Sequence, residues 1–469
     1  MRISHLAGYG RLSTTARGSV DNEGLASLSL LKIQSSLCSK DRVVTGDEMN
    51  IHVPQSIEAQ NELRMLAAAK YNIINPQSSK PNMCIVQDSL LSAYRLTMGN
   101  VKVPKEQFFN ISMSISITTE EFHQKIKTIN QVFKEKNKSY DCFSGHGLFS
   151  LILPSDLHYE KRNGINPLEP IVKIFRGVLY EGTLDKSILG QSHNSLILII
   201  NKEYGCDRCA DFIDNAQFIT NNWLLYSGFT IGLKDCLISD PKQSTKISDV
   251  IQKYYLEAET IEGTTTIPHV RELRVIGALG KAKDIGLRIA KESLDPTNNF
   301  LSTVRSGSKG DFFNIAQITG LLGQQNIVGK RVNPSLNNNT RTLPHYPFDK
   351  LSTEKKYESR GFIAASFAKG LNSREFWTHA MSGREGICDT AMGTARSGYI
   401  QRQLIKNLED VKVQYDGTVR DSTGKIFQYA YGENGYDPAN TVAVKGFQQV
   451  CDVARLVNRL NVEVELNKK

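Results

Sequence analysis

The sequence predicts an α+β fold composed of several subdomains, and three observations lead to this prediction. In the N-terminal half, short apolar and β-prone runs alternate with helical stretches. In the middle of the chain, two long segments of helical periodicity are joined by a turn rich in threonine. Near the C-terminal end, a long helical segment contains no proline. We therefore expect mixed strand and helix over residues 47–235, mainly helix over 240–330, and one long helix over 371–410.

The elements of the N-terminal half follow from local patterns. Two prolines and small polar residues mark a loop at 75–81. Apolar runs bounded by glycine, proline and asparagine are typical of strands. On these grounds we expect helices at 57–70, 89–97 and 211–225, and strands at 148–154, 171–180 and 196–200.

Two helical segments in the middle of the chain, 247–260 and 269–294, are separated by Glu262-Gly263-Thr264-Thr265-Thr266. Two helices joined by a short connection typically pack side by side, so this pattern predicts an antiparallel helical hairpin. A further helix is expected at 312–322.

The segment 372–410 allows two interpretations. Asn372 is a favourable N-cap residue, and Glu375 stands at the position of its reciprocal partner in a capping box. The segment also contains glycines, each of which costs a helix about 1 kcal/mol relative to alanine. It is therefore either one long helix, whose glycines serve close approach to a ligand or bending, or two ordinary helices broken near the first glycine. The glycines are Gly383, Gly386, Gly393 and Gly398.

Composition excludes two classes of protein. Hydrophobic residues make up 40% of the 469 residues, which is too many for a disordered chain. No apolar run approaches the roughly 20 residues of a membrane-spanning helix, so no membrane partner is expected. The formal net charge of +9 fits a polyanionic partner such as nucleic acid, although many other proteins share it.

The cysteines indicate a reducing, intracellular setting because they are scattered along the chain. One Cys-x-x-Cys pair, Cys206 and Cys209, stands without the second pair that a structural zinc site needs. We interpret the two as thiols at a turn before the 211–225 helix, and zinc as the less favoured alternative.

The residues around the glycine-containing segment carry a family resemblance. Residues 381–391 read MSGREGICDTA and residues 394–402 read TARSGYIQR. This segment closely resembles the bridge helix of the largest subunit of multisubunit DNA-directed RNA polymerases. The nearest likeness is to eukaryotic polymerase II and to the polymerases of large nucleocytoplasmic DNA viruses. One departure is Gly393, where the family usually has lysine.

Other blocks appear in the order of the same family. They include GDEMNIHVPQS at 46–56, GTLDK at 182–186, SGSKG at 306–310, GQQ at 323–325, RTLPH at 341–345 and YDGTVR at 415–420. The resemblance implies a mixed pore domain, a helical-hairpin funnel and one long bridge helix. The implied divisions are a non-family and disordered segment at 1–45, the end of the active-site loop and the pore domain at 46–235, the funnel domain at 236–345, the bridge helix and the start of the cleft domain at 346–437, and a helical extension at 438–469.

The resemblance also exposes a damaged metal loop. In the family this loop reads Asn-Ala-Asp-Phe-Asp-Gly-Asp, and its three aspartates hold the catalytic Mg²⁺. Here Val43 and Thr45 replace the first two aspartates, so only Asp47 remains as a metal ligand. The ligand set for Mg²⁺ is therefore incomplete in this chain. Because the family pattern begins abruptly at Gly46, we hypothesise that the preceding residues are foreign sequence.

The resemblance places two groups of site residues. Thr394, Ala395, Gly398 and Tyr399 would lie near the templating base and the nascent base pair, with ordinary helix packing as the alternative for Thr394 and Ala395. Gln324, Gln325, Lys330, Arg331, Arg384 and Glu385 would line the channel that admits nucleotides, with exposed loop charge and pairing with neighbours as the alternatives.

The function implied by the resemblance is template-directed RNA synthesis by a nucleotidyltransferase that acts only within a complex. The expected partners are the other polymerase subunits, including the second-largest, together with DNA template, RNA and ribonucleoside triphosphates. The expected location is intracellular and soluble, in the nucleus or in a viral factory or virion. The alternative, favoured by the damaged metal loop, is a truncated or degenerate fragment that assembles or binds nucleic acid without chemistry.

Overall fold

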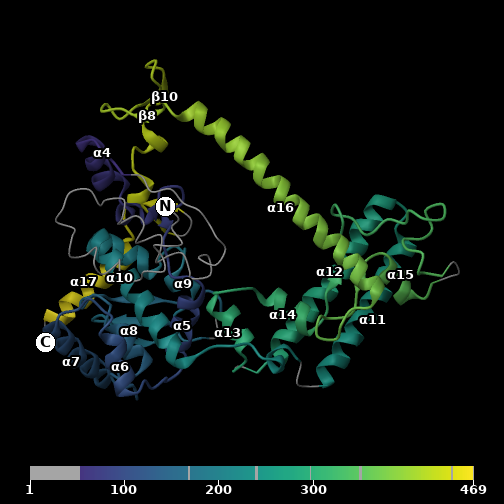
Figure 1. Ribbon diagram of the computed structural model, residues 1–469, viewed down its shortest axis with the longest axis horizontal. Helices are drawn as coiled ribbons and strands as arrows, with labels where there is room; N and C mark the ends of the chain where they lie inside the picture. Colours follow the sequence, from purple (N-terminus) through teal and green to yellow (C-terminus); the bar gives the residue numbers. More distant parts are fainter. Residues whose placement is uncertain are drawn as a thin grey trace. The chain divides into compact units, whose positions relative to one another are not determined.

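The computed structural model describes residues 53–166, 169–237, 241–295, 297–347, 351–444 and 447–467 (Figure 1). The expectations for residues 1–45 and for Asp47 lie outside the described residues. The chain divides into two compact units. Among the described residues, the first unit contains those up to Gly228, Arg305–Lys309 and those from Ala430 onward, and the second contains those within Phe229–Val304 and Gly310–Tyr429.

The first unit is a helical body with small antiparallel sheets. Its α-helices are α4 (Ile57–Glu62), α5 (Gln87–Thr97), α6 (Lys105–Ser112), α7 (Thr119–Glu135), α8 (Gly145–Ser150), α9 (Lys186–Leu189), α10 (Leu196–Ser227) and α17 (Val453–Asn467). Its strands are β1 (Ile74–Asn75), β2 (Lys80–Pro81), β3 (Tyr159–Lys161), β4 (Val172–Phe175), β5 (Val178–Glu181), β11 (Val442–Val444) and β12 (Phe447–Gln449). The central sheet has the order β3-β4-β5, with Tyr159 opposite Ile174 and Phe175 opposite Val178.

Two of the three predicted strands are wrong. Residues 148–154 complete α8 and continue into turns, and residues 196–200 form the first turns of α10. Both helices begin at a serine cap: the Ser144 side chain accepts from the amide of Gly147, and the Ser195 side chain accepts from the amide of Leu198. A continuous apolar run that is buried on every side has no periodicity, so it does not distinguish a strand from a buried helix. The predicted strand at 171–180 is confirmed, as the hairpin β4-β5.

Helix α10 begins well before the predicted helix at 211–225. It contains a break at Gly205, whose φ of 85° and ψ of 170° are not helical. Positive φ is a conformation that glycine adopts without strain. Cys206 and Cys209 follow this break, and the buried Cys209 thiol lies 3.5 Å from the Ile197 carbonyl oxygen. The two thiols thus lie just after a break between two helical segments, in agreement with the expected turn before a helix, although the second segment starts earlier than residue 211.

The second unit is built around a helical hairpin. Its α-helices are α11 (Pro241–Thr264), α12 (Pro268–Ser293), α14 (Phe312–Thr319), α15 (Thr353–Ser359) and α16 (Ser373–Leu408), and α13 (Asn299–Ser306) also begins here. Its strands are β6 (Gly323–Gln324), β7 (Phe362–Ile363), β8 (Lys412–Val413), β9 (Val419–Arg420) and β10 (Ile426–Gln428). Strand β6 pairs with β7, and β8, β9 and β10 form a three-stranded antiparallel sheet.

The predicted antiparallel hairpin is confirmed in α11 and α12. Lys281 on α12 pairs with Glu257 on α11 at 3.3 Å, and Arg274 donates to the Thr265 hydroxyl at 3.4 Å. Contacts that advance along one helix while they retreat along the other define an antiparallel pair. None of the described helices combines the length and the apolar character that a membrane span needs.

Helix α16 is one continuous helix of 36 residues (Figure 1). Its start is the predicted capping box, because the Asn372 side chain accepts from the amides of Arg374 and Glu375 while the Glu375 carboxylate accepts from the amide of Asn372. The interpretation as two helices broken near Gly383 is therefore wrong. The cap makes the start locally favourable, and the helical backbone passes through the glycines without a break.

The core of the first unit contains a neutral histidine. His146 is 1% exposed, its Nε2 atom lies 3.1 Å from the Gly182 carbonyl oxygen, and its ring stacks on Tyr140 at 4.6 Å between centroids. Its Nδ1 atom has no hydrogen-bond partner among the residues that the structure describes. Burial lowers the pKa of His146 to about 4, because a charged imidazolium would have to lose its water inside the core.

We expect this histidine to make the first unit less stable in acid. As the pH falls from 7 toward 4, the unfolded chain takes up a proton at His146 that the folded chain does not. The free energy of unfolding should therefore decrease, by up to about 2 kcal/mol at pH 5. Urea unfolding at pH 7 and pH 5, followed by Trp223 fluorescence in a Trp377→Phe background, measures the difference.

The matched variants are His146→Gln, which should lose this part of the pH dependence, and His123→Gln, at an exposed histidine, which should keep it. An equal pH dependence in His146→Gln and in the parent chain would contradict the assignment.

Candidate functional site

The start of α16 is held by contacts within the second unit. Besides the capping box, Arg374 pairs with Glu358 on α15 at 3.0 Å. Glu375 and Thr378 are the buried residues of α16 among those described. The ion pair with α15 and the buried residues of the first turns therefore fix the direction of α16.

The loop 323–331 lies along the next turns of α16. The His379 ring lies 3.4 Å from the side-chain oxygen of Gln325, and the Ser382 hydroxyl donates to the Asn326 carbonyl oxygen at 3.1 Å. The backbone amide of Val328 donates to the Glu385 carboxylate at 2.7 Å. These three bonds are spaced along one side of the helix and align loop and helix over two turns.

The same loop is tied to the segment before α16. The Gln325 amide donates to the Gly361 carbonyl oxygen at 2.8 Å, and the Gln324 side chain donates to the Arg360 carbonyl oxygen at 3.0 Å. Gly361 has a φ of +100°, and a Cβ at this position would lie 2.8 Å from the Gln325 carbonyl oxygen. Only glycine allows this close approach of the two backbones.

Arg331 is the last residue of the loop, and its buried side chain lies in an ion network. Its side chain is 3% exposed, and it donates to the Glu272 carboxylate at 2.8 and 2.9 Å and to Glu262 at 3.4 Å. Arg360 also contacts Glu272 at 3.3 Å, and Lys356 pairs with Glu262. Burial alone would raise the pKa of Glu272, but the hydrogen bonds and charge of Arg331 hold it below its ordinary value.

The C-terminal part of α16 carries the other predicted site residues. Thr394, Ala395, Gly398 and Tyr399 are all exposed, and Tyr399 is 65% exposed. The Thr394 hydroxyl donates to the Thr390 carbonyl oxygen at 2.8 Å, a bond inside the helix. The pairs 394/398 and 395/399 are each four residues apart, so the four residues share one side of the helix. This part of α16 also exposes Ile387, Met392, Ile400, Leu404, Ile405 and Leu408.

The structure does not gather the predicted channel residues into one cluster. Gln324 bonds to the Arg360 backbone, Gln325 bonds to the Gly361 backbone and to His379, and Glu385 accepts from the Val328 amide. Lys330 and Arg384 are exposed cations on the loop and on α16. The side chain of Arg331 instead turns into the network with Glu262 and Glu272. Its charge is compensated there, and it holds the loop in place.

Three residues of this site were not found from the sequence. Glu262 and Glu272 receive the Arg331 side chain, and Ser382 bonds the loop to α16. A buried arginine needs acidic partners, but the sequence does not indicate which of the 48 acidic residues they are.

No group of three or more His, Cys, Asp or Glu in the described ranges could hold a metal ion. Asp47, the expected Mg²⁺ ligand, lies outside those ranges. The sequence nearby has Val43 and Thr45 where carboxylates would be needed, so the residues present do not fit a catalytic Mg²⁺ site.

Family models of RNA polymerase Rpb1 match three stretches of the chain. Domain 3 matches residues 72–236, domain 4 matches residues 263–363, and domain 5 matches residues 370–464. Together they cover most of the chain that the structure describes.

Individual proteins are similar over nearly the whole chain. A probable DNA-directed RNA polymerase II subunit RPB1 homolog of Invertebrate iridescent virus 6 is 44% identical over 449 residues, which covers 90% of this chain and 42% of that protein. The DNA-directed RNA polymerase II subunits RPB1-A and RPB1-B of Trypanosoma brucei brucei are each 36% identical over 408 residues, covering 84% of this chain and 22% of those proteins. The chain thus spans less than half the length of the curated relatives it matches.

We expect the Arg331 network to stabilise the second unit. Arg331→Met should lower the free energy of unfolding by about 2 kcal/mol, because two half-buried carboxylates lose the charge-assisted hydrogen bonds of the buried guanidinium. Urea unfolding followed by Trp377 fluorescence in a Trp223→Phe background measures this change.

The matched control is Lys281→Met, which breaks an ion pair whose lysine is 62% exposed and should cost less than about 1 kcal/mol. Equal losses in the two variants would show that Arg331 is no more important than a surface charge.

Proposed function

The chain belongs to the family of Rpb1, the largest subunit of RNA polymerase, and we propose that it acts in transcription as part of that subunit. In this proposal it works within a multisubunit complex that joins ribonucleoside triphosphates into RNA on a DNA template. Its partners are the other polymerase subunits, the second-largest among them, and the nucleic acids. Its proposed location is intracellular, in the nucleus or in a viral factory or virion.

The observation that carries this proposal is the form of α16. A 36-residue helix is anchored by its first turns and exposes the side of Thr394, Ala395, Gly398 and Tyr399. We propose that α16 is the bridge helix, and that these four residues contact the templating base and the nascent base pair. Small side chains at 395 and 398 leave room for a base pair to stack against the helix, and Tyr399 offers an aromatic ring beside it.

The second part of the proposal is the nucleotide channel. Lys330 is an exposed cation of the loop that bonds to α16, and Arg384 is an exposed cation beside Glu385, which accepts one of the loop's bonds. Exposed positive charge attracts a triphosphate electrostatically. Arg331 acts differently in this proposal: its charge is compensated by glutamates, and it positions the loop that carries Lys330.

The chain by itself lacks the full set of ligands for the catalytic metal. We derive no step through Mg²⁺, because Val43 and Thr45 leave the loop without two of three carboxylates. We propose that the chain alone has no polymerase activity and that the complete set of ligands comes from outside this sequence. The same substitutions favour the second candidate function, a non-catalytic fragment that assembles with a polymerase or binds nucleic acid.

Reconstitution separates the two candidates. The tagged full chain, produced together with the remaining polymerase subunits of its own source, should co-purify with the second-largest subunit. It should be required for Mg²⁺-dependent, template-directed RNA synthesis, and should give no synthesis alone. Co-purification without any dependence of RNA synthesis on the chain would support the non-catalytic fragment. Absence of co-purification would contradict the polymerase subunit and the assembling fragment, and would leave a fragment that binds nucleic acid by itself.

The glycines of α16 provide a sharper test within an active complex. A Cβ at Gly386 or Gly398 would meet no described atom within 4 Å, so alanine fits in the chain itself at both positions. If a base pair stacks on α16 near Gly398, Gly398→Ala should slow nucleotide addition about tenfold, equivalent to about 1.4 kcal/mol of activation free energy. Single-turnover primer extension measures the rate.

Two further variants separate stacking from bending. Gly277→Ala, at an equally open position on α12, controls for the general effect of alanine on helix stability. Gly386→Ala stiffens α16 away from the stacking position, so slowing in both α16 variants indicates that bending matters. An unchanged rate in Gly398→Ala would remove α16 from the active site.

A further inference from the structure

The tip of the loop 323–331 is a tight hairpin turn. The Ile327 amide donates to the Lys330 carbonyl oxygen at 2.8 Å, and the Lys330 amide donates back to the Ile327 carbonyl oxygen at 3.0 Å. The two residues between them, Val328 and Gly329, have φ of +51° and +69°. Positive φ at both central residues is the pattern of a type I′ turn, which favours asparagine, aspartate or glycine at both positions.

Val328 is therefore a costly residue for its position. It is the only β-branched residue with positive φ in the part of the chain that the structure describes. A branched side chain crowds the backbone in this conformation, so the turn is strained. The Val328 side chain is 76% exposed, and its packing does not compensate the strain. Some other contact must hold the turn in this form.

Glu385 on α16 supplies that contact. The Val328 amide donates to the Glu385 carboxylate at 2.7 Å. A hydrogen bond to a carboxylate is about twice as strong as one between neutral groups. Because the donor is the backbone amide of the strained residue itself, a change in the turn would displace the donor from the carboxylate.

The base of the loop is held independently of this bond. The Gln325 amide donates to the Gly361 carbonyl oxygen at 2.8 Å, and the Ser382 hydroxyl donates to the Asn326 carbonyl oxygen at 3.1 Å. These bonds precede the turn and do not involve Glu385. A change in the turn can therefore be confined to residues 327–330.

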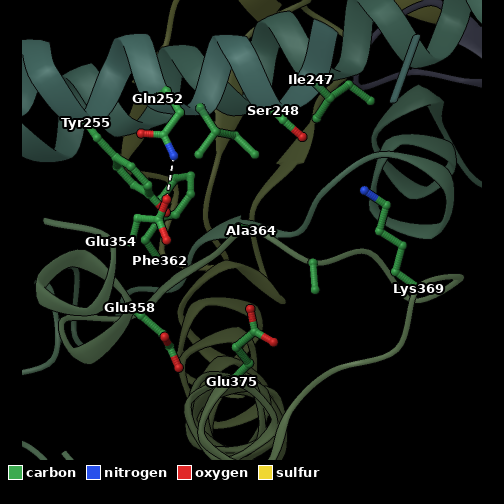
Figure 2. Close-up of a pocket in the computed structure, with 12 residues that line it drawn as sticks. Ile247, Ser248, Gln252, Tyr255, Glu354, Glu358, Phe362, Ala364, Lys369 and Glu375 are labelled. Atoms are coloured by element: carbon green, nitrogen blue, oxygen red, sulfur yellow. Dashed lines mark hydrogen bonds between the residues drawn. The ribbon is translucent and has the colours of Figure 1, made fainter. Parts of the chain in front are cut away.

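The first turns of α16 are fixed as well. A pocket of about 370 Å³, the acidic pocket, lies between α11, α15 and the start of α16, and Tyr255, Glu354, Glu358 and Glu375 are among its lining residues (Figure 2). Each of these carboxylates is already bonded: Glu354 to Gln252, Glu358 to Arg374 and Glu375 to the Asn372 amide. We therefore interpret the pocket wall as part of the helix anchor.

Glu385 itself lies where α16 is weak. It stands between Gly383 and Gly386, and a Cβ at either glycine would meet no described atom within 4 Å. Neither close packing nor positive φ requires glycine there, and each glycine lowers the helix propensity. Bending at these glycines would move the Glu385 carboxylate while the anchored first turns stay in place.

We propose that residues 327–330 form a two-state latch that Glu385 holds closed. When α16 bends and withdraws the carboxylate, Val328 relaxes to negative φ, the residues that flank the turn splay apart, and the hydrogen bond from the Ile327 amide is lost. The turn carries Lys330, so the position of this exposed cation follows the state of α16. The latch is a property of the chain, while its role in guiding a triphosphate rests on the proposed function.

The test follows hydrogen exchange of the Ile327 amide in the purified full chain, by mass spectrometry at single-residue resolution. Glu385→Leu keeps a good helix former but removes the acceptor, and should speed this exchange about tenfold. Glu385→Gln, which keeps a neutral acceptor, should give a smaller increase. The Gln325 amide is the internal reference and should not change.

The matched control is Glu409→Leu at the other end of α16, which should leave exchange at Ile327 as in the parent chain. Unchanged exchange at Ile327 in Glu385→Leu would overturn the proposal. An equal acceleration at Gln325 would also overturn it, because the whole loop would then have loosened.

Variants of Val328 test whether strain is the reason that the turn needs Glu385. Asparagine suits positive φ, so in a Val328→Asn background Glu385→Leu should speed exchange at Ile327 by less than about twofold. Val328→Ala shortens the side chain but keeps a Cβ, and should retain most of the dependence on Glu385. The same acceleration in the parent and Val328→Asn backgrounds would contradict the latch.

The role in nucleotide addition is tested in the reconstituted complex. Val328→Asn keeps the turn closed whatever the state of α16, so it should slow single-turnover nucleotide addition a few-fold, whereas Val328→Ala should act like the parent. An unchanged rate in Val328→Asn would contradict this role. RNA synthesis that does not depend on the chain would contradict the proposed function, and neither result alters what hydrogen exchange shows about the latch.

Discussion

The second unit depends on one buried ion network, in which Arg331 donates to Glu272 and Glu262 from the two helices of the hairpin. A buried guanidinium is stable only where carboxylates compensate it, and these carboxylates stand on different helices, α11 and α12. The network therefore fixes the end of the loop 323–331 against the hairpin. The loop in turn bonds to α16 through Gln325, Asn326 and Val328. The direction of the long helix is thus set by charges that lie well away from it in sequence.

Helix α16 has two parts with different physical character. The first turns are capped, ion-paired and partly buried, while the residues after Glu385 are exposed except for the half-buried Gly393, and they include Gly386 and Gly398. Packing does not stabilise an exposed helical segment, so its stability depends on intrinsic propensity, which glycine lowers. A rigid anchor followed by a segment of low intrinsic stability is suited to a helix that bends against a ligand while its base stays in place.

The acidic pocket and the helix anchor share residues. Glu375 both caps α16 and lines the pocket, and Glu358 both pairs with Arg374 and lines it. The wall of this pocket and the start of α16 are therefore built from the same two carboxylates.

Local sequence patterns were sufficient to predict part of this architecture. Asn372 and Glu375 form a capping box that depends only on residues three apart, and the hairpin pattern of α11 and α12 is likewise local, so the sequence by itself determined where these elements lie. The sequence motifs, which occur in the same order as in the polymerase family, likewise identified the family from the sequence alone. Only the tertiary structure decided that the apolar runs at 148–154 and 196–200 begin or complete helices. A segment that is buried on all sides lacks the hydrophobic periodicity that distinguishes a helix from a strand. The tertiary structure also decided that Arg331 turns inward and that Glu354, Glu375 and Tyr255 surround one cavity, because such contacts join segments far apart in the chain and depend on which of many acidic residues come within reach.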